Sequence, residues 1–474
     1  MQRQTKVIAT LGPAVASQEA VTELVEAGMD VARLNFSHGD HDFHRELFSW
    51  VRAASSSTGR TVAIMQDIQG PKLRLGKIRN ASRVLERGTE VRLTPGGEAA
   101  DTDTIPVVYE ALLEDVEPGH RVILADGMAT LEVLETVDGV LRAVVTAPGP
   151  IADKCGVAFP DSILSVQSVT PKDVDDLAFG KDLGVDYVAA SFVRSAEDVK
   201  AVAALVEAPV IAKIELAQAL ANLDEILTAS FGVMVARGDL GVQLPLERIP
   251  LIQSDILHRA NRAGRISVTA TEMLESMTRS ARPTRAEVTD VANAVMAGTD
   301  AVMLSGETAI GDYPVQAVAA MAKICRTVEQ GTLSERAAVP FVGDENHVAS
   351  AVAQAATQIA LNVGARTIVA FTESGSTARL ISKYRPTQRI VAFTPNEVTL
   401  RRLALYWGVH PHSFERKVYT DDEIASAASM LAKEGLADEG ETIVMVAGVP
   451  PNFQASTNLV KVHRIGEEAG GLGG

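Results

Sequence analysis

Short apolar runs that alternate with helical patterns constrain the fold of this chain more than any other feature. Eight runs have the length and composition of buried strands: Thr5–Thr10, Asp30–Phe36, Val62–Met65, Tyr187–Phe192, Val210–Glu215, Gly232–Ala236, Ile266–Thr271 and Ala301–Leu304. Parallel strands that helices cover on both faces read as near-continuous apolar runs, and a (β/α)8 barrel contains eight of them. The sequence therefore predicts an α/β protein built on a TIM barrel.

One spacing in this series is anomalous. Far more chain lies between Asp67 and Asp186 than between any other pair of runs, and long loops without their own structure are uncommon in compact domains. Within this stretch, Leu131–Thr136 and Val140–Thr146 flank Asp138-Gly139, the turn dipeptide of a β-hairpin. We therefore expect a β domain, residues 71–168, inserted between barrel segments 1–70 and 169–335.

A second unit follows the barrel. The polar stretch 331–346 contains Pro340 and Gly343 and is typical of a linker. Beyond it, the runs 367–371, 389–393 and 442–446 alternate with helical stretches, which indicates a separate open-sheet α/β domain over 346–474. The glycine-rich tail 467–474 is expected to fray.

Composition excludes several classes of protein. The chain is 46% hydrophobic and 22% charged, as globular proteins are, and its net charge of −16 repels phosphate backbones, so nucleic acid is not expected as a partner. No window reaches the roughly 18 apolar residues of a membrane span. With only Cys155 and Cys325 and a polar start at Gln2, Arg3 and Gln4, we expect a cytoplasmic protein.

Candidate site residues lie where barrel strands end, because those ends face the mouth of a TIM barrel. Lys213 and Glu215 are two apart on one strand and point to the same face, either as an active pair or as a structural ion pair. Asp239 follows the next strand, either as a helix cap or as a partner of Glu215 in holding Mg²⁺. The amides of Gly238 and Asp239 could bind an anion at the helix start.

Further polar residues complete the predicted mouth. Thr271 and Ser305 end two later strands, where hydroxyls also serve as helix caps. The segment RLNFSHG offers donors for phosphate: Arg33, Asn35, Ser37 and His38. Together these residues predict a metal-bound substrate that carries phosphate, and hence phosphoryl transfer or enolate chemistry.

At this point the sequence resembles the pyruvate kinase family. The resemblance runs over nearly the whole chain, in the motifs TKVIATLGP, GMDVARLNFSHGD, QDIQGPKLR, VIAKIE, MVARGDLGVQLPLE, ATEMLESM, RPTRAEVTDVANAV and MLSGETAIGDYP. It implies a barrel interrupted after its third strand by a mobile β-barrel domain and followed by a regulatory α/β domain. It also implies transfer of the phosphoryl group of phosphoenolpyruvate to ADP in glycolysis, giving pyruvate and ATP.

The resemblance assigns roles by motif. Lys213 is implied to neutralise the phosphoryl group and the enolate, and Glu215 and Asp239 to hold Mg²⁺, for which Mn²⁺ can substitute. Thr271 and Ser305 are implied to take part in protonating the enolate, with Thr271 and the Gly238 and Asp239 amides orienting the substrate carboxylate. Arg33 would hold the phosphoryl group. The nucleotide side is implied to comprise Asn35, His38, Arg74 and Lys154.

Some positions depart from the family pattern. Its monovalent-cation site matches at Asn35, Ser37 and Asp67, but Ile68 replaces a threonine and Lys72 a nearby glutamate. We therefore expect that the ammonium of Lys72 lies near Asp67 and makes potassium unnecessary, the alternative being an exposed hinge lysine. A family lysine in the inserted domain falls on Cys155, with Lys154 displaced by one, and Glu272 stands where many relatives have glutamine.

The last domain is expected to bind a phosphorylated effector. Its loop gathers hydroxyls and amides at a helix start, either as an ordinary cap or as the phosphate cradle of the family: Thr372, Ser374, Gly375, Ser376 and Thr377. Glu373 places an anion where relatives that respond to fructose bisphosphate commonly carry lysine. We therefore expect activation by a monophosphate, either a sugar monophosphate or AMP.

Two other functions stay open from the residues alone. A metal-dependent aldolase or lyase acting on the enolate of pyruvate would share the metal and the lysine, but needs neither RLNFSHG nor a nucleotide lid. A non-catalytic relative that only binds phosphorylated ligands is opposed by the intact Lys213, Glu215, Asp239 and Thr271. The family is usually a homotetramer, which the resemblance implies here as well.

Overall fold

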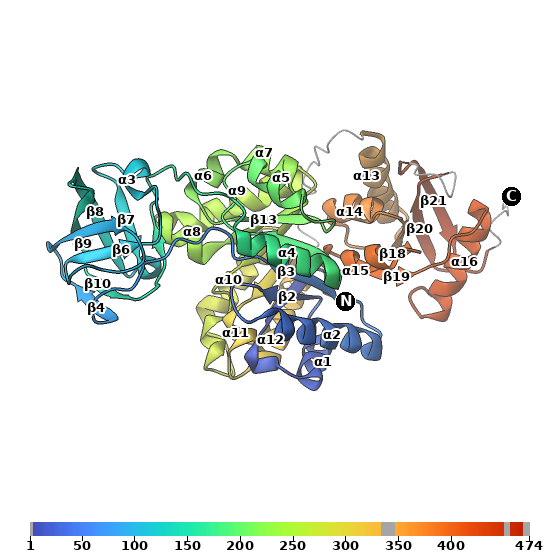
Figure 1. Cartoon of the computed structure of the whole chain (residues 1–474). Helices are drawn as coiled ribbons and strands as arrows, with labels where there is room; N and C mark the ends of the chain where they lie inside the picture. The colour runs from blue at the N-terminus through green and yellow to red at the C-terminus, as the bar shows by residue number, and fades with distance from the viewer. Residues whose placement is uncertain (1–2, 333–346, 450–455, 468–474) are drawn as a thin grey trace.

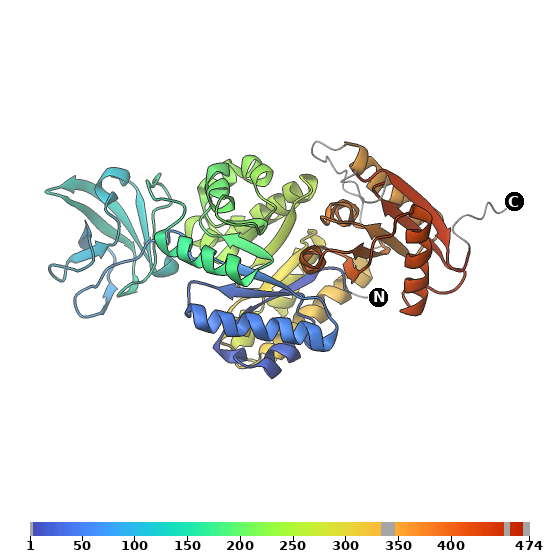
Figure 2. The same cartoon turned by 45° about the vertical axis from the view of Figure 1, so that its right-hand side comes forward.

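The computed structural model describes residues 3–332, 347–449 and 456–467, so most of the expected linker and tail lies outside the described residues. Three bodies follow one another in space. Figures 1 and 2 show the β domain at one end of the central barrel and the C-terminal domain at the other. No helix among the described residues is long and apolar enough to cross a membrane.

The central body is the predicted closed parallel barrel. Its strands run in the order β1-β16-β15-β14-β13-β12-β3-β2, with every neighbouring pair parallel. Their bounds confirm all eight predicted runs: β1 Lys6–Leu11, β2 Val31–Asn35, β3 Ala63–Asp67, β12 Tyr187–Ala190, β13 Val210–Ile214, β14 Gly232–Ala236, β15 Ile266–Ala270 and β16 Ala301–Leu304.

Helices surround this barrel, and several begin at side-chain caps. Ser17, Asp40, Thr170 and Thr284 each accept a hydrogen bond from a backbone amide in the first turn of their helix. The α-helices of the barrel are α1 Gln18–Ala27, α2 His41–Thr58, α4 Pro171–Leu183, α5 Ala196–Ala203, α6 Ala217–Ala221, α7 Leu223–Ala229, α8 Arg237–Gln243, α9 Ile249–Arg262, α10 Arg285–Met296, α11 Gly306–Ala309 and α12 Pro314–Thr332.

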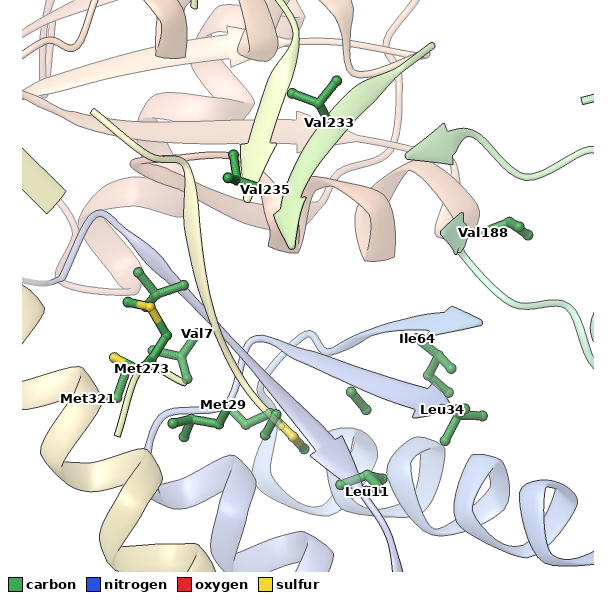
Figure 3. Close-up of a cluster of buried hydrophobic side chains, with 14 of the residues drawn as sticks. Val7, Leu11, Met29, Leu34, Ile64, Val188, Val233, Val235, Met273 and Met321 are labelled. Carbon is green, nitrogen blue, oxygen red and sulfur yellow. The ribbon is translucent and has the colours of Figure 1, made fainter. Parts of the chain in front are cut away.

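Alternation along each strand divides the barrel core in two. On β1, Val7 and Ala9 pack outward against the helices, in a cluster of which Figure 3 shows a part, whereas Ile8 packs into the lumen. The lumenal cluster continues out of the barrel into the C-terminal domain, where it includes Ile368 and Tyr406. One apolar core therefore spans two domains.

The insertion between β3 and α4 is a β domain with its own core. It contains a six-stranded sheet, a two-stranded sheet and one short α-helix: β4 Ser82–Leu85, β5 Glu90–Pro95, β6 Thr104–Val107, α3 Leu112–Asp115, β7 Arg121–Leu124, β8 Ala129–Val137, β9 Val140–Ala147, β10 Gly149–Ala152 and β11 Val157–Ala158. Bridges from Leu75 to Val107 and from Arg74 to Gly156 join the two edges of the larger sheet, so it rolls up. The predicted hairpin is confirmed, with Asp138 and Gly139 at φ 49° and 74°.

The C-terminal domain is an open five-stranded sheet in the order β19-β18-β17-β20-β21. The three predicted strands are confirmed, and two edge strands were not foreseen, of which the last is antiparallel. The elements are α13 His347–Asn362, β17 Thr367–Phe371, α14 Ser376–Lys383, β18 Arg389–Thr394, α15 Glu397–Arg402, β19 Val409–Ser413, α16 Thr420–Lys433, β20 Thr442–Ala447 and β21 Leu459–Arg464.

Charged pairs reinforce the junction of this domain with the barrel. Lys383, at the end of α14, lies 2.6 Å from Asp300, the residue before β16. Both side chains are fully buried. Arg385 lies 2.9 Å from the same carboxylate, and Arg401 lies 2.8 Å from Asp186. Because breaking a buried pair leaves an uncompensated charge, these contacts resist separation of the two domains.

Candidate active site

The lumenal register of the barrel brings polar side chains together at the carboxyl ends of its strands. Ile8, Val31, Met65 and Ile211 face the lumen, so the residues two positions further along their strands share that face. These residues are Thr10, Arg33, Asp67 and Lys213. Apolar side chains therefore fill the lumen up to this level, and polar side chains follow at the carboxyl ends of the strands.

Asp67 is the centre of this cluster. Its carboxylate accepts a hydrogen bond of 2.6 Å from Nε of Arg33, and the Lys213 ammonium lies 3.2 Å away, while its side chain is only 1% exposed. Burial alone would raise its pKa, but Arg33 and Lys213 outweigh burial, so the pKa of Asp67 lies below its usual range. Arg33 also donates to the Thr10 hydroxyl, which fixes its guanidinium.

Lys213 lies between two carboxylates. Its Nζ is 2.9 Å from Oε1 of Glu215 and donates a hydrogen bond of 2.8 Å to the Ser191 hydroxyl. Burial lowers the pKa of Lys213, but the charges of Asp67 and Glu215 raise it more, so its net pKa lies above the usual lysine range. The ammonium therefore stays charged at neutral pH and is held ready for an anion.

Glu215 follows β13 and is buried, with 1% of its side chain exposed. Its other oxygen accepts a hydrogen bond of 2.7 Å from the amide of Phe192. Burial and the negative charge of Asp239 raise the pKa of this carboxyl, against the opposing effect of Lys213. A cation bound beside Glu215 and Asp239 would relieve the part of this effect that comes from repulsion between the two carboxylates.

Asp239 lies in the first turn of α8, whose N-cap is Ala236, so it is not the helix cap that one interpretation allowed. The ammonium of Lys72, where the chain enters the inserted domain, is 3.7 Å from this carboxylate and 3.4 Å from that of Asp126 in the inserted domain. The ion pairs of Lys72 are thus with Asp239 and Asp126, which the sequence did not predict as its partners, and its nearness to Asp67 stays a prediction. The lysine that contacts Asp67 is Lys213.

Glu215 and Asp239 fit a hard divalent cation. Both carboxylates line one cleft between the barrel and the inserted domain. Within the described ranges, no group of three acidic, histidine or cysteine side chains gathers as a metal site. Two carboxylates suit Mg²⁺, which usually takes one or two of them and completes its shell with water and substrate oxygens.

The two predicted hydroxyls follow their strands directly, and neither hydroxyl caps a helix, although Ser305 occupies the N-cap position of α11. The Thr271 hydroxyl donates to the carbonyl of Ala270 and accepts a hydrogen bond of 2.8 Å from the Gly238 amide. The Gly238 amide, expected to face substrate, is thus already engaged. Ser305 makes no side-chain cap for α11, and its amide donates to the buried carboxylate of Glu307.

The predicted nucleotide residues form two separate groups. On the barrel, the Asn35 side chain accepts from the Ser37 amide, and its carbonyl accepts from the amide of the exposed His38. In the inserted domain, Arg74 donates to the carbonyl of Lys154, which brings that pair together. Among the described residues, no hydrogen bond or ion pair joins the two groups.

The predicted effector loop lines a separate pocket at the start of α14. Gly375 takes φ 87° there, and its amide donates to the Thr372 hydroxyl. Ser374 donates to Ser376, and Thr377 shares a hydrogen bond with Thr457. The structure therefore gathers all five predicted loop residues at one helix start.

Glu373 is not the uncompensated anion that the sequence suggested. Its carboxylate lies 2.7 Å from Arg416, and Arg416 in turn lies 2.9 Å from Glu423. Arg402 also lines this pocket. Two arginines were thus missed, because they lie outside the loop motif and reach the pocket only through the fold.

Thr10, Ser191, Arg237 and Glu307 were also missed in the catalytic cluster. Thr10 ends its predicted strand and Ser191 is the last residue but one of its own, so the rule that found Lys213 could have found them. Glu307 is buried and accepts hydrogen bonds from the amides of Leu274 and Ser305. It thereby links the turns after β15 and β16.

Comparison with known proteins finds similarity over nearly the whole chain. A family model described as pyruvate kinase, barrel domain, matches residues 2–318, and one described as pyruvate kinase, alpha/beta domain, matches residues 350–463. A pyruvate kinase of Geobacillus stearothermophilus is 42% identical over 480 residues, covering 98% of this chain and 81% of the relative.

Two further matches extend the comparison. A pyruvate kinase of Mycobacterium tuberculosis is 41% identical over 475 residues, covering 99% of this chain and 100% of the relative. The crystal structure of a pyruvate kinase from Cryptosporidium parvum matches with a TM-score of 0.91 at 35% identity, covering 98% of this chain and 96% of the other. The described fold agrees with these matches, and the chain belongs to the pyruvate kinase family.

Proposed function

We propose that the lumenal cluster of this chain transfers the phosphoryl group of phosphoenolpyruvate to ADP, as its family implies. The observation that carries the proposal is the charged Lys213 held between Asp67 and Glu215 at the mouth of the barrel. Membership of the family makes the chain a phosphotransferase of glycolysis. A coupled assay for pyruvate tests the reaction in the presence of Mg²⁺, with and without ADP.

Lys213 and Arg33 supply the positive charge for the transferring group. Phosphoryl transfer asks the protein mainly for positioning and charge, and such preorganised charge acts strongly where water is excluded. Lys213 faces both the phosphoryl oxygens and the enolate oxygen that develops as the group leaves. When bound by Glu215 and Asp239, Mg²⁺ supplies Lewis-acid stabilisation of the same charge.

Thr271 and Ser305 serve the second half of the reaction. The enolate gains a proton at carbon, and the two hydroxyls take part in the relay that delivers it. Thr271 also orients the substrate carboxylate. Its hydrogen bond with the Gly238 amide holds the hydroxyl beside the turn that carries Asp239.

The inserted domain closes over the nucleotide. Asn35 and His38 contribute from the barrel side, and Arg74 and Lys154 from the inserted domain. Because these groups lie on separate bodies, closure brings them to one ADP molecule and excludes water from the phosphoryl group.

An aldolase or lyase acting on the enolate of pyruvate is the second candidate, because it would use the same metal and lysine. Such an enzyme would release pyruvate without ADP. Dependence of pyruvate formation on ADP separates the two functions. The paired Arg74 and Lys154 in the inserted domain favour the kinase.

We also propose that the enzyme works without potassium. Ile68 is 1% exposed within the apolar core and offers no oxygen to a cation. Asp67 already pairs with Arg33 and Lys213, so a monovalent ion beside it has little charge left to neutralise.

Activity is expected to be the same in sodium and in potassium buffers. Lys72→Glu is expected to lose activity, because it replaces the cation beside Asp239 and Asp126 with a third anion. Steady-state assays with each salt at constant ionic strength provide the measurement. Strong activation of the unmodified enzyme by potassium would contradict the proposal.

The pocket at the start of α14 is proposed to bind a phosphorylated effector. It offers loop hydroxyls together with Arg402 and Arg416, but Glu373 and Glu423 compete for the charge of Arg416. One phosphate group therefore matches the available positive charge better than two.

A sugar monophosphate or AMP is expected to activate at lower concentration than fructose 1,6-bisphosphate. Titration of each ligand at subsaturating phosphoenolpyruvate gives the order. Glu373→Gln should strengthen activation by every phosphate, because it releases Arg416. Tightest activation by the bisphosphate, or persistence of activation in a Ser374→Ala, Thr377→Ala double variant, would count against this site.

A homotetramer in the cytoplasm is the proposed state of the protein. Large apolar side chains on the barrel, such as Leu246 and Leu251, are about three-quarters exposed at 73% and 74%, as expected of a contact surface. Native mass spectrometry should give four times the chain mass of 50.2 kDa. A monomeric mass at micromolar concentration would exclude the tetramer.

A further inference from the structure

The turn after β15 has an uncommon backbone conformation. Thr271 and Glu272 take φ 66° and 52°, the left-handed region that residues with a Cβ rarely adopt. Two such residues in succession persist only where surrounding groups hold them. The question is therefore which groups hold this turn.

Arg237, the first residue of α8, holds this turn through hydrogen bonds. Its Nε lies 3.2 Å from the carbonyl oxygens of both Ala270 and Thr271, and its Nη2 donates a hydrogen bond of 2.6 Å to the Thr271 carbonyl. Its Nη1 lies 2.6 Å from the carboxylate of Asp290 on α10. The planar fork of arginine suits this combination, which a single ammonium cannot reproduce.

Through these hydrogen bonds, Arg237 also affects the position of the Thr271 hydroxyl. Because Arg237 holds the carbonyls on both sides of the Thr271 Cα, it fixes the direction in which the Thr271 side chain leaves the turn. That hydroxyl accepts from the amide of Gly238, the residue after Arg237, and Asp239 comes next. The threonine turn and the turn that carries a proposed metal ligand are thereby tied together.

We propose that Arg237, anchored by Asp290, is a positioning residue that sets the Thr271 hydroxyl for proton transfer to the enolate. The Arg237 side chain is 11% exposed and hydrogen-bonds to the backbone carbonyls of this turn, through which it acts on Thr271. The inference rests on the role proposed for Thr271. Neither residue was singled out by the sequence.

Exchange of the pyruvate methyl protons isolates this step. In D₂O with Mg²⁺ and ATP, the enzyme removes a proton from C3 of pyruvate, the C–H electron pair passes into the enolate, and a deuteron returns to the same carbon. Proton NMR follows the loss of the methyl signal. Arg237→Met is expected to slow this exchange by about 10²-fold, the cost of a misplaced reacting group.

The other variants define the pattern. Arg237→Lys and Asp290→Asn, which are milder changes, should each slow exchange less than Arg237→Met. The double variant of Arg237→Met with Asp290→Asn should be no slower than Arg237→Met alone, because Asp290 acts through Arg237. The KM for ADP and the dissociation constant of Mn²⁺ should stay unchanged.

Arg259→Gln is the matched control, since Arg259 pairs with Asp224 at 2.5 Å on the barrel surface. Exchange no slower in the Arg237 variants than in this control would overturn the proposal, as would equal damage to ADP and Mn²⁺ binding. Thr271→Ala distinguishes failure of the role proposed for Thr271 from failure of the inference about Arg237. If it leaves exchange unchanged, the role of Thr271 fails. If it abolishes exchange while Arg237→Met does not, the inference about Arg237 alone fails.

Discussion

Lys213→Met is expected to lower turnover by at least about 10²-fold, the loss typical when a preorganised electrostatic group is removed. Lys213 is the cation that faces both the leaving phosphoryl group and the enolate, so its contribution is made mainly in the transition state. Methionine keeps an unbranched apolar stem that is one atom shorter than lysine. Asp67 keeps Arg33 as a partner, so the variant should fold.

Removal of Lys213 should also change metal binding, in a direction that can be predicted. Lys213 lowers the pKa of Glu215, so its removal should raise that pKa further and make metal binding weaker at low pH. Assays with saturating Mg²⁺ above neutral pH avoid this effect. Lys181→Met is the control, because Lys181 forms a surface pair with Glu207. A folded Lys213→Met enzyme with near-normal turnover would refute the assignment.

Glu215→Gln and Asp239→Asn are each expected to weaken divalent metal binding by at least about tenfold, since even loss of an outer partner of a metal ligand costs 10- to 100-fold. Each change keeps the shape of the side chain and removes an anionic oxygen, which a hard cation prefers. The Mg²⁺ concentration for half-maximal activity should rise in both variants.

Binding of Mn²⁺ measured directly by electron paramagnetic resonance provides the second readout. Asp126→Asn is a useful comparison, because Asp126 shares Lys72 with Asp239 but is not a proposed ligand. Unchanged metal dependence in both Glu215→Gln and Asp239→Asn would make these carboxylates structural and place the metal elsewhere.

The strands found from the sequence are those with continuous apolar runs. All eight barrel strands are buried, so their composition is sufficient to locate them. The two missed strands lie at the edges of the C-terminal sheet, where Val409–Ser413 carries two histidines and a proline and Leu459–Arg464 carries three basic residues. Edge strands need less burial, so their pattern is weaker.

The candidate site was predictable to the extent that it depends on strand ends. Position along a strand predicts Lys213 and Glu215, whereas Asp67 comes from the family resemblance, and the structure brings the three together. The partner of Lys72 depends on how the inserted domain sits on the barrel, and the pairing of Glu373 with Arg416 joins residues 43 apart in sequence. Long side chains from separate elements have no local signal in a sequence.

The apolar cluster that passes from the barrel lumen into the C-terminal domain has a consequence for how the protein loses its structure. Pulling that domain away would separate the Tyr406 ring from that of Phe231 and leave Asp300 and Lys383 without each other, so we expect the two bodies to unfold as one cooperative unit. The inserted domain has a core of its own and can open or melt independently. The barrel and the C-terminal domain thus form one unit of stability, whereas the inserted domain can fluctuate separately.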